Sequence, residues 1–125
     1  MVDVANVMGA RPDGWWRDRP GAALRLGREV AALAGQEEAP ASGWVLVLEG
    51  RARDAAPLLA AELAGTPVRL VSALGSGDDT IVQVVAESVA RDESCLVVTA
   101  DRELRRRCEE LNASVVGPGW LLGRL

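Results

Sequence analysis

The 125-residue sequence contains no histidine, no lysine and no tyrosine. These absences remove most of the side chains that enzymes use as general acids, general bases and nucleophiles near neutral pH. The chain also lacks an apolar run approaching the roughly 20 residues needed to cross a bilayer, and no apolar signal-peptide core follows its start. We therefore expect a soluble, cytoplasmic protein with no membrane partner, whose chemistry depends on carboxylates and a bound metal ion.

Cysteine is also rare. Cys95 falls in a predicted strand and Cys108 on a predicted helix, which indicates two reduced thiols and no disulfide framework. A reactive-cysteine enzyme has little support, because the chain has no histidine to activate either thiol.

The net charge of −4 argues mildly against a general binder of polyanions. All the positive charge is arginine, which grips phosphate groups with two parallel hydrogen bonds. A high-GC codon bias explains the absence of lysine equally well. The arginines of interest form two groups, the first Arg11, Arg17 and Arg19, and the second Arg102, Arg105, Arg106 and Arg107.

Apolar runs rich in valine, leucine and isoleucine alternate with segments of helical period, a pattern typical of successive βα units. We predict strands near residues 2–7, 44–48, 67–71, 94–98 and 113–116. We predict helices near residues 20–34, 53–64, 78–91 and 101–111. The fold class is therefore α/β, with a central, mostly parallel five-stranded sheet in a three-layer α/β/α arrangement. With 49% hydrophobic residues, residues 1–125 fit one domain, onto which Trp120, Leu121 and Leu122 of the tail pack back.

Asp3 is the most informative residue, because it lies between valines in the first predicted strand with no capping or turn role to explain it. An ionised carboxylate in a buried strand is costly unless a cation or hydrogen bonds compensate it. Asn6 follows three positions later. The alternative is a buried aspartate satisfied by backbone amides or an arginine. Met1 lies only two residues upstream, which leaves open a biological start before this numbering.

Two more acidic sites follow later predicted strands. Asp78 and Asp79 open one helix and Asp101 the next, and helix capping explains each site by itself, since Ser76 and Asp79 have the capping-box spacing. If the sheet forms as predicted, these acids meet Asn6 and Glu49 at the carboxyl edge, where parallel sheets bind ligands, while Asp3 lies deeper, just before that edge. Crowded carboxylates raise one another's pKa values and bind a hard divalent cation. We expect Asp79 to contact the metal and Asp78 to position the loop.

Other side chains near this edge could contact a substrate. Trp15 and Trp16 could stack on unpaired bases while Arg11, Arg17 and Arg19 hold phosphates. Burial of the indoles or a homodimer contact explains the tryptophans equally well. Arg102, beside Asp101, is the best placed of its group to reach a phosphate. Glu49, at the end of the second strand, is a secondary candidate for an outer ligand or a loop contact.

Three motifs occur in order along the chain: VDVANV at residues 2–7, GDDTI at residues 77–81 and VVTADREL at residues 97–104. Together they resemble the PIN-like nuclease superfamily, and within it the NYN domains of the YacP-like group. The segment GARPDGWWRDR at residues 9–19 is similar to the loop of actinobacterial members of that group.

The resemblance implies a Rossmannoid three-layer fold that cuts RNA with Mg²⁺ or Mn²⁺ held by carboxylates. Transferred by position, it implies Asp3, Asp79 and Asp101 as the acidic core. It also implies Asn6 and Thr99 as supporting polar groups, with Asp78 as a further metal contact.

Three functional hypotheses follow. The first is a metal-dependent endoribonuclease acting on single-stranded RNA, directed to its target by the ribosome or another partner. The second is a catalytically weak or inactive module of the same fold that binds RNA or the ribosome. The third is a domain that binds a nucleotide or phosphorylated small molecule at the same edge, which is weaker because no glycine-rich phosphate motif opens any helix.

Overall fold

The computed structural model describes residues 1–125 and contains one five-stranded sheet. The strands lie in the order β3-β2-β1-β4-β5, and every neighbouring pair is parallel. Their bounds are β1 Val2–Asp3, β2 Trp44–Leu48, β3 Val68–Ser72, β4 Leu96–Val98 and β5 Ser114–Val116. This topology confirms the predicted α/β class and shows a sheet that is wholly parallel.

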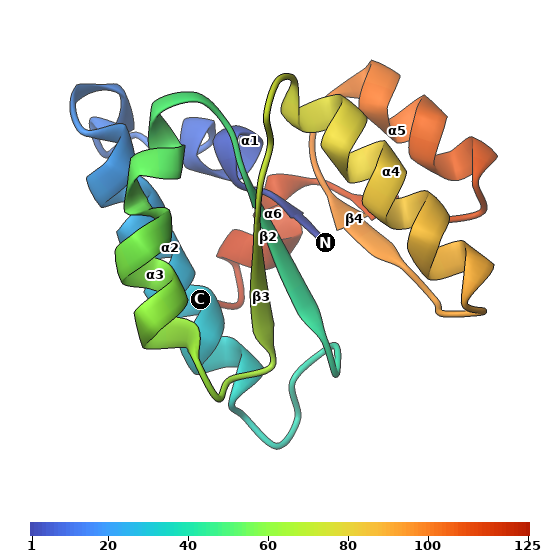
Figure 1. The fold of residues 1–125 in the computed structure, drawn as a ribbon, viewed down its shortest axis with the longest axis horizontal. Helices are drawn as coiled ribbons and strands as arrows, with labels where there is room; N and C mark the ends of the chain where they lie inside the picture. The colour runs from blue at the N-terminus through green and yellow to red at the C-terminus, as the bar shows by residue number, and fades with distance from the viewer.

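Helices cover both faces of the sheet, which gives the predicted three layers (Figure 1). One face carries α1 Val4–Gly9, α2 Arg19–Ala34, α3 Ala56–Leu63 and α6 Pro118–Leu122. The other face carries α4 Gly77–Ala90 and α5 Arg102–Glu110. Two 3₁₀ helices, η1 Trp15–Arg17 and η2 Gly50–Ala55, precede α2 and α3. No helix is long and apolar enough to span a membrane.

The side chains of β2 show how the two faces are filled. Leu46 and Leu48 enter the core beneath α2 and α3, whereas Val47 enters the core beneath α4 and α5. Successive side chains of a strand point to opposite faces, so a strand covered on both sides is apolar throughout. The tail closes the first core as predicted, because Leu121 is buried there and Trp120 and Leu122 pack against it.

The first predicted strand is largely wrong. Only Val2–Asp3 is a strand, and Val4–Gly9 is the helix α1. The apolar run is ambiguous because its buried members have helical spacing: Val4, Val7 and Met8. Asp3 is the N-cap of α1, and its side chain accepts a hydrogen bond from the backbone of Asn6. Asp3 therefore has a capping role, contrary to the prediction. It is also the last residue of β1, whereas the prediction placed it inside the strand.

Two smaller features also differ from the prediction. Residues 53–64, predicted as one helix, divide between η2 and α3. Cys95, predicted within a strand, lies just before β4. Cys108 is buried on α5, as predicted, and both thiols are free.

The strand order creates a switch point between β1 and β4. The chain builds the sheet from β1 outward through β2 and β3, then crosses to place β4 on the other side of β1. Doubly wound sheets bind ligands in the crevice at the carboxyl ends of the strands where the order reverses. Asp3 ends β1, and Thr99 directly follows β4. These two residues therefore flank the place where such a fold presents a site.

Candidate functional site

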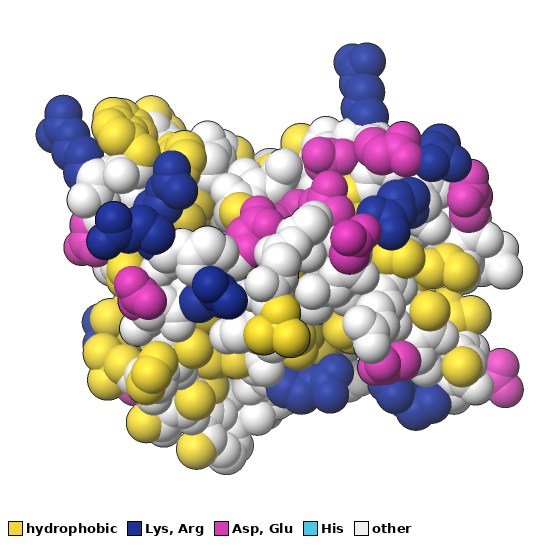
Figure 2. Space-filling view, turned by 45° about the horizontal axis from the view of Figure 1, so that its top comes forward, with side chains coloured by type: hydrophobic (Ala, Val, Ile, Leu, Met, Phe, Trp, Pro, Cys, Tyr) yellow, Lys and Arg dark blue, Asp and Glu magenta, His cyan; other side chains and the backbone are white.

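A pocket of about 340 Å³ lies at the carboxyl edge of the sheet. Four segments contribute carboxylates to it: the end of β1, the end of β2, the start of α4 and the N-cap of α5. In Figure 2 acidic side chains gather on this face of the molecule. The lining contains no arginine and consists of Asp3, Ala5, Asn6, Glu49, Ser76, Asp78 and Asp101.

A larger hollow of about 810 Å³ lies at the opposite, amino edge of the sheet. Its lining includes Trp44, Arg69 and Ser114, and its single carboxylate, Glu93, pairs with Arg91 at 2.8 Å. It lacks the grouped carboxylates of the smaller pocket.

Asp3 is the most buried of the four pocket carboxylates, with 6% of its surface exposed. Its Oδ2 accepts a hydrogen bond from the hydroxyl of Thr99 at 2.9 Å, and its Oδ1 accepts one from the backbone of Asn6 at 3.5 Å. Burial raises the pKa of Asp3 to about 6, and the charges of Asp78 and Glu49 add to this, while the two hydrogen bonds act in the opposite direction. The alternative explanation was a buried aspartate satisfied by backbone amides or an arginine. It applies only in part, because one of the two donors is the hydroxyl of Thr99.

Thr99 and Asn6 join the first strand to the loop after β4. The fully buried Thr99 hydroxyl donates to Asp3 and accepts from the backbone N–H of Asp101 at 3.1 Å. Oδ1 of Asn6 accepts from the backbone N–H of Ala100 at 2.7 Å. Both residues predicted to support the site therefore hold its two sides together.

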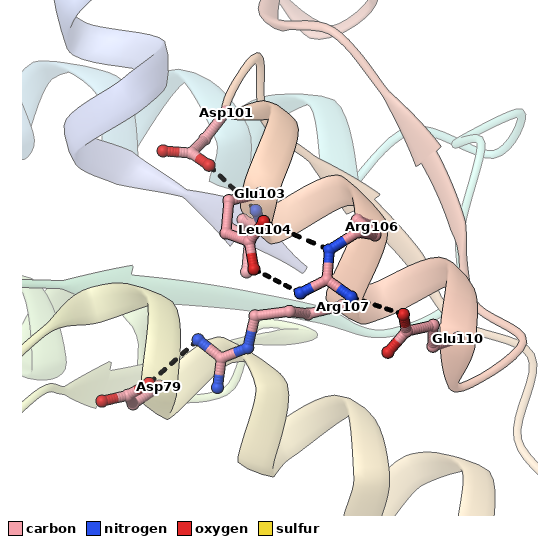
Figure 3. Close-up of polar contacts among 7 residues, drawn as sticks. All are labelled: Asp79, Asp101, Glu103, Leu104, Arg106, Arg107 and Glu110. Atoms are coloured by element: carbon pink, nitrogen blue, oxygen red, sulfur yellow. Dashed lines mark hydrogen bonds and ion pairs between the residues drawn. The ribbon is translucent and has the colours of Figure 1, made fainter.

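Asp101 caps α5, as its position in the sequence suggested. Its Oδ1 accepts a hydrogen bond from the backbone N–H of Leu104 at 2.9 Å (Figure 3). Oδ2 has no hydrogen-bond partner in the protein, and the residue lines the pocket. One carboxylate can therefore cap the helix and still offer an oxygen to a ligand.

The structure places Asp78, and not Asp79, in the pocket. Asp79 is 74% exposed and pairs with Arg107 of α5 at 2.9 Å, as Figure 3 shows. The expected capping box does not form either, because Ser76 accepts from the backbone of Asp78. Neighbouring helical residues point about 100° apart, so only one of the pair can face the pocket. The expectation that Asp79 faces the site is therefore wrong, and Asp78 is the one of the pair that lines the pocket.

The environment of Asp78 resembles that of Asp3. Partial burial raises the pKa of Asp78, and the charges of Asp101 and Glu49 raise it further, while Arg107 acts in the opposite direction. The pocket therefore holds two carboxylates whose charged forms are destabilised.

Glu49 connects the end of β2 to the start of α4. Its Oε2 accepts a hydrogen bond from the backbone N–H of Gly77 at 2.6 Å. A Cβ atom on Gly77 would lie 2.7 Å from the same oxygen, so an alanine at this position would displace the end of the Glu49 side chain. The sequence indicated Glu49 only as a secondary candidate, and the structure includes it in the pocket lining.

The tryptophan and arginine candidates lie outside the pocket lining. Trp15 packs partly buried against the core, whereas Trp16 is 56% exposed. The two rings meet edge to face at 6.1 Å, and Arg17 lies over Trp16 at 5.7 Å. Arg11 is held by two hydrogen bonds to Glu29, at 3.0 and 2.5 Å. Arg11 is therefore bound within the protein, and Trp16 with Arg17 presents the exposed stacking surface.

Most arginines of α5 pair with neighbouring acids. Arg106 contacts Glu103 and Glu110 (Figure 3). Arg105 lies 3.9 Å from Glu109. Arg102 is exposed at the start of α5 and has no ion-pair partner. It remains the arginine of this group that is available to a substrate.

The side chains of the pocket are of the kind that binds a hard divalent cation. No group of three or more Asp, Glu, His or Cys side chains, however, is arranged to hold a metal ion by itself. All the donors are oxygens, and burial together with neighbouring carboxylates raises the pKa values of Asp3 and Asp78. Mg²⁺ commonly binds through one or two carboxylates, with water and substrate phosphate completing its shell. The pocket fits a partly hydrated ion of this kind.

The three sequence motifs meet at this edge of the sheet: the first spans β1 and α1, the second opens α4, and the third spans β4 and α5. The resemblance to YacP-like NYN domains stays a prediction made from these motifs. Comparisons with protein-family models, curated proteins and solved structures give no match to this chain.

Proposed function

We propose that this protein is a metal-dependent endoribonuclease that hydrolyses RNA phosphodiesters with Mg²⁺ or Mn²⁺. One observation carries the proposal: four carboxylates from four separate segments line one pocket at the switch point of a parallel sheet, with no arginine among them. Three of the four accept hydrogen bonds at helix starts, but crowding their like charges costs stability, and functional sites are where raised pKa values of this kind gather. A cytoplasmic place of action is part of the same proposal.

Asp3, Asp78 and Asp101 are the residues that would hold the ion, one or two of them directly and the rest through coordinated water. When bound, the ion would lower the pKa of a coordinated water and offset the charge of the reacting phosphate. The carboxylates must be ionised to bind it, and a nearby cation favours that form of Asp3 and Asp78.

The surrounding residues fix these carboxylates in place. Thr99 holds the side chain of Asp3 and the backbone of Asp101 through one hydroxyl group. Asn6 fixes the loop after β4, and Glu49 holds the start of α4, which carries Asp78. Ligands held in advance by a hydrogen-bonded surround lose little freedom when they bind.

The substrate that suits the surface is single-stranded RNA. Trp16 offers an exposed indole on which a base could stack, with Arg17 beside it, and Arg102 places an unpaired guanidinium next to Asp101. Aromatic stacking and arginine contacts to phosphate are the common means of binding unpaired strands. With a net charge of −4, we expect a ribosome or another partner to supply target selection.

The test is cleavage of a labelled single-stranded RNA in Mn²⁺, Mg²⁺ or EDTA. The variants are Asp3→Asn and Asp101→Asn, with Asp79→Asn as the matched control outside the pocket. We expect product only with metal, loss of product in the first two variants, and near-normal product in the control. Wild-type rates in Asp3→Asn and Asp101→Asn would refute the assignment.

A second candidate function is an RNA- or ribosome-binding module of the same fold that does not cut. It is favoured by the absence of a three-carboxylate group arranged to hold a metal ion. Retention of RNA by the wild-type protein without any metal-dependent product would support this function over the first.

A further inference from the structure

Among the residues that line the acidic pocket, only Asn6 and Ser76 are polar and neutral. The others are the four carboxylates and Ala5. Ionised carboxylates only accept hydrogen bonds, and so do the oxygens of a phosphodiester, so the two kinds of group cannot pair directly. A phosphate in this pocket therefore finds side-chain hydrogen-bond donors only at Asn6 and Ser76.

The side-chain amide of Asn6 has a fixed orientation. One of its corners lies 2.7 Å from the backbone nitrogen of Ala100, whose N–H donates to it. A backbone N–H can only donate, so the amide atom that faces it must be the oxygen, Oδ1. Nδ2 therefore occupies the other corner of the amide, and its two N–H groups are directed away from Ala100.

Nδ2 of Asn6 has no hydrogen-bond partner in the protein. The side chain of Asn6 makes one hydrogen bond, through Oδ1 to Ala100. Nε1 of Trp44 is the one buried side-chain nitrogen or oxygen without a partner, so Nδ2, which also lacks one, is open to solvent. Asn6 is half-buried and lines the pocket. Its two N–H groups are therefore available to a ligand there.

The amide also lies between two of the pocket carboxylates. Asn6 is in the first turn of α1, which Asp3 caps, and the backbone N–H of Asn6 donates to that cap. At its other end the side chain reaches Ala100, the residue directly before Asp101. A phosphate that enters the pocket between Asp3 and Asp101 therefore meets the free donors of Asn6.

We propose that Asn6 is a catalytic residue whose Nδ2 donates a hydrogen bond to a non-bridging oxygen of the scissile phosphate. The inference rests on the proposed ribonuclease function. In the hydrolysis, the oxygen of water bonds to phosphorus and the bond from phosphorus to one ribose oxygen breaks. That ribose oxygen gains a proton, and the attacking water loses one. A donor fixed in advance stabilises the charge of the reacting phosphate oxygens without having to reorganise.

The test compares three variants in steady-state cleavage of a single-stranded RNA. Asn6→Asp keeps an oxygen for the N–H of Ala100 but has no donor, and Asn6→Ala has neither. The control Asn112→Asp adds the same charge outside the pocket, at a left-handed position (φ 67°) that asparagine and aspartate both tolerate. We expect kcat to fall at least about tenfold in both Asn6 variants and to stay at the wild-type value in the control.

Hydrogen exchange of the Ala100 amide separates the donor role of Asn6 from its hold on the loop after β4. We expect this amide to be protected in the wild-type protein and in Asn6→Asp, and to lose protection in Asn6→Ala, because only alanine removes the acceptor. If Asn6 only positioned the loop, Asn6→Asp would keep both the protection and the wild-type rate. That combination would refute the proposal.

Sulfur substitution in the RNA shows whether the contact is direct. One phosphorothioate is placed at the cleaved linkage, with sulfur in place of one or the other non-bridging oxygen, because sulfur is the weaker acceptor. We expect the wild-type protein to cleave the two stereoisomers at different rates. Asn6→Ala should reduce the ratio of these rates at least about threefold, since it has no donor to sense the sulfur. An unchanged ratio would contradict a direct contact.

The role of Asn6 and the nuclease proposal fail in different ways. If the wild-type protein cleaves RNA and the Asn6 variants cleave it equally well, the hydrogen bond to phosphate is refuted and the nuclease stands. If the wild-type protein cleaves no RNA in Mn²⁺ or Mg²⁺, the nuclease is refuted, and the catalytic role of Asn6 fails with it.

Discussion

The hydroxyl of Thr99 donates a hydrogen bond to Oδ2 of Asp3 at 2.9 Å, although the two residues are 96 positions apart in the chain. The same hydroxyl accepts a hydrogen bond from the backbone of Asp101. One threonine therefore links the end of β1 to the N-cap of α5 across the switch point of the sheet. This link holds a carboxylate in a buried position where burial raises its pKa, in addition to its role as the N-cap of α1.

The raised pKa of Asp3 predicts that Asp3→Asn stabilises the protein at neutral pH. Between pH 3.8 and about 6 the unfolded chain releases a proton that the folded protein keeps, so the free energy of unfolding falls as pH rises. Above pH 6 the full penalty applies, on the order of 1–3 kcal/mol. Urea unfolding should show Asp3→Asn more stable than wild type at pH 7.5, with that advantage gone near pH 3.5. An equal difference at both pH values would contradict the prediction.

Asp78 and Asp79 form a matched pair of neighbours with different surroundings. We expect Asp78→Asn to reduce metal-dependent cleavage at least about tenfold, because a carboxylate that holds the ion is lost. We expect Asp79→Asn to keep the wild-type rate and to change stability by less than about 1 kcal/mol, since its partner Arg107 lies at the surface. Kinetic assays and urea unfolding of both variants check this. A larger rate loss in Asp79→Asn would reverse the assignment.

Binding of a divalent cation should depend on pH through the same carboxylates. Below pH 6 Asp3 holds a proton that a cation must displace, and the raised pKa of Asp78 acts in the same direction. We expect millimolar Mn²⁺ to raise the melting temperature at pH 7.5 by several times more than at pH 5. Asp3→Asn should lose most of this shift, and Asp79→Asn should retain it. Equal shifts in all three proteins would place the ion elsewhere.

Gly77 and Gly75 test the contact between Glu49 and α4. An alanine Cβ at position 77 would lie 2.7 Å from Oε2 of Glu49 and displace that carboxylate, whereas at position 75 it would meet nothing within 4 Å. We expect Gly77→Ala to lower stability by no more than about 1.5 kcal/mol, the contribution of one hydrogen bond, and to reduce cleavage because Glu49 no longer holds the start of α4. Gly75→Ala should be neutral or stabilising by up to about 1 kcal/mol. Thermal unfolding of the two variants measures this difference in stability. Equal melting temperatures would show that the Glu49 side chain moves away from α4 without cost.

Much of the fold follows from local patterns in the sequence. The apolar stretch of β2 and the caps of α4 and α5 identify a parallel sheet with helices on both faces, because strand burial and helix capping depend on nearby residues. The same patterns placed Asp78 and Asp101 at helix starts, where the structure finds them, but they placed Asp3 inside a strand that in fact ends at this residue.

The sequence alone thus determined the α/β class, the acidic character of one edge and most of the residues that line its pocket. Only the tertiary structure decided that β1 ends at Asp3, because the following apolar residues satisfy a strand and a helix equally well. It also decided that Asp78 faces the pocket while Asp79 faces Arg107, and that Thr99 joins the two acids. These outcomes depend on contacts between segments distant in the chain, and such contacts leave no local pattern in the order of residues.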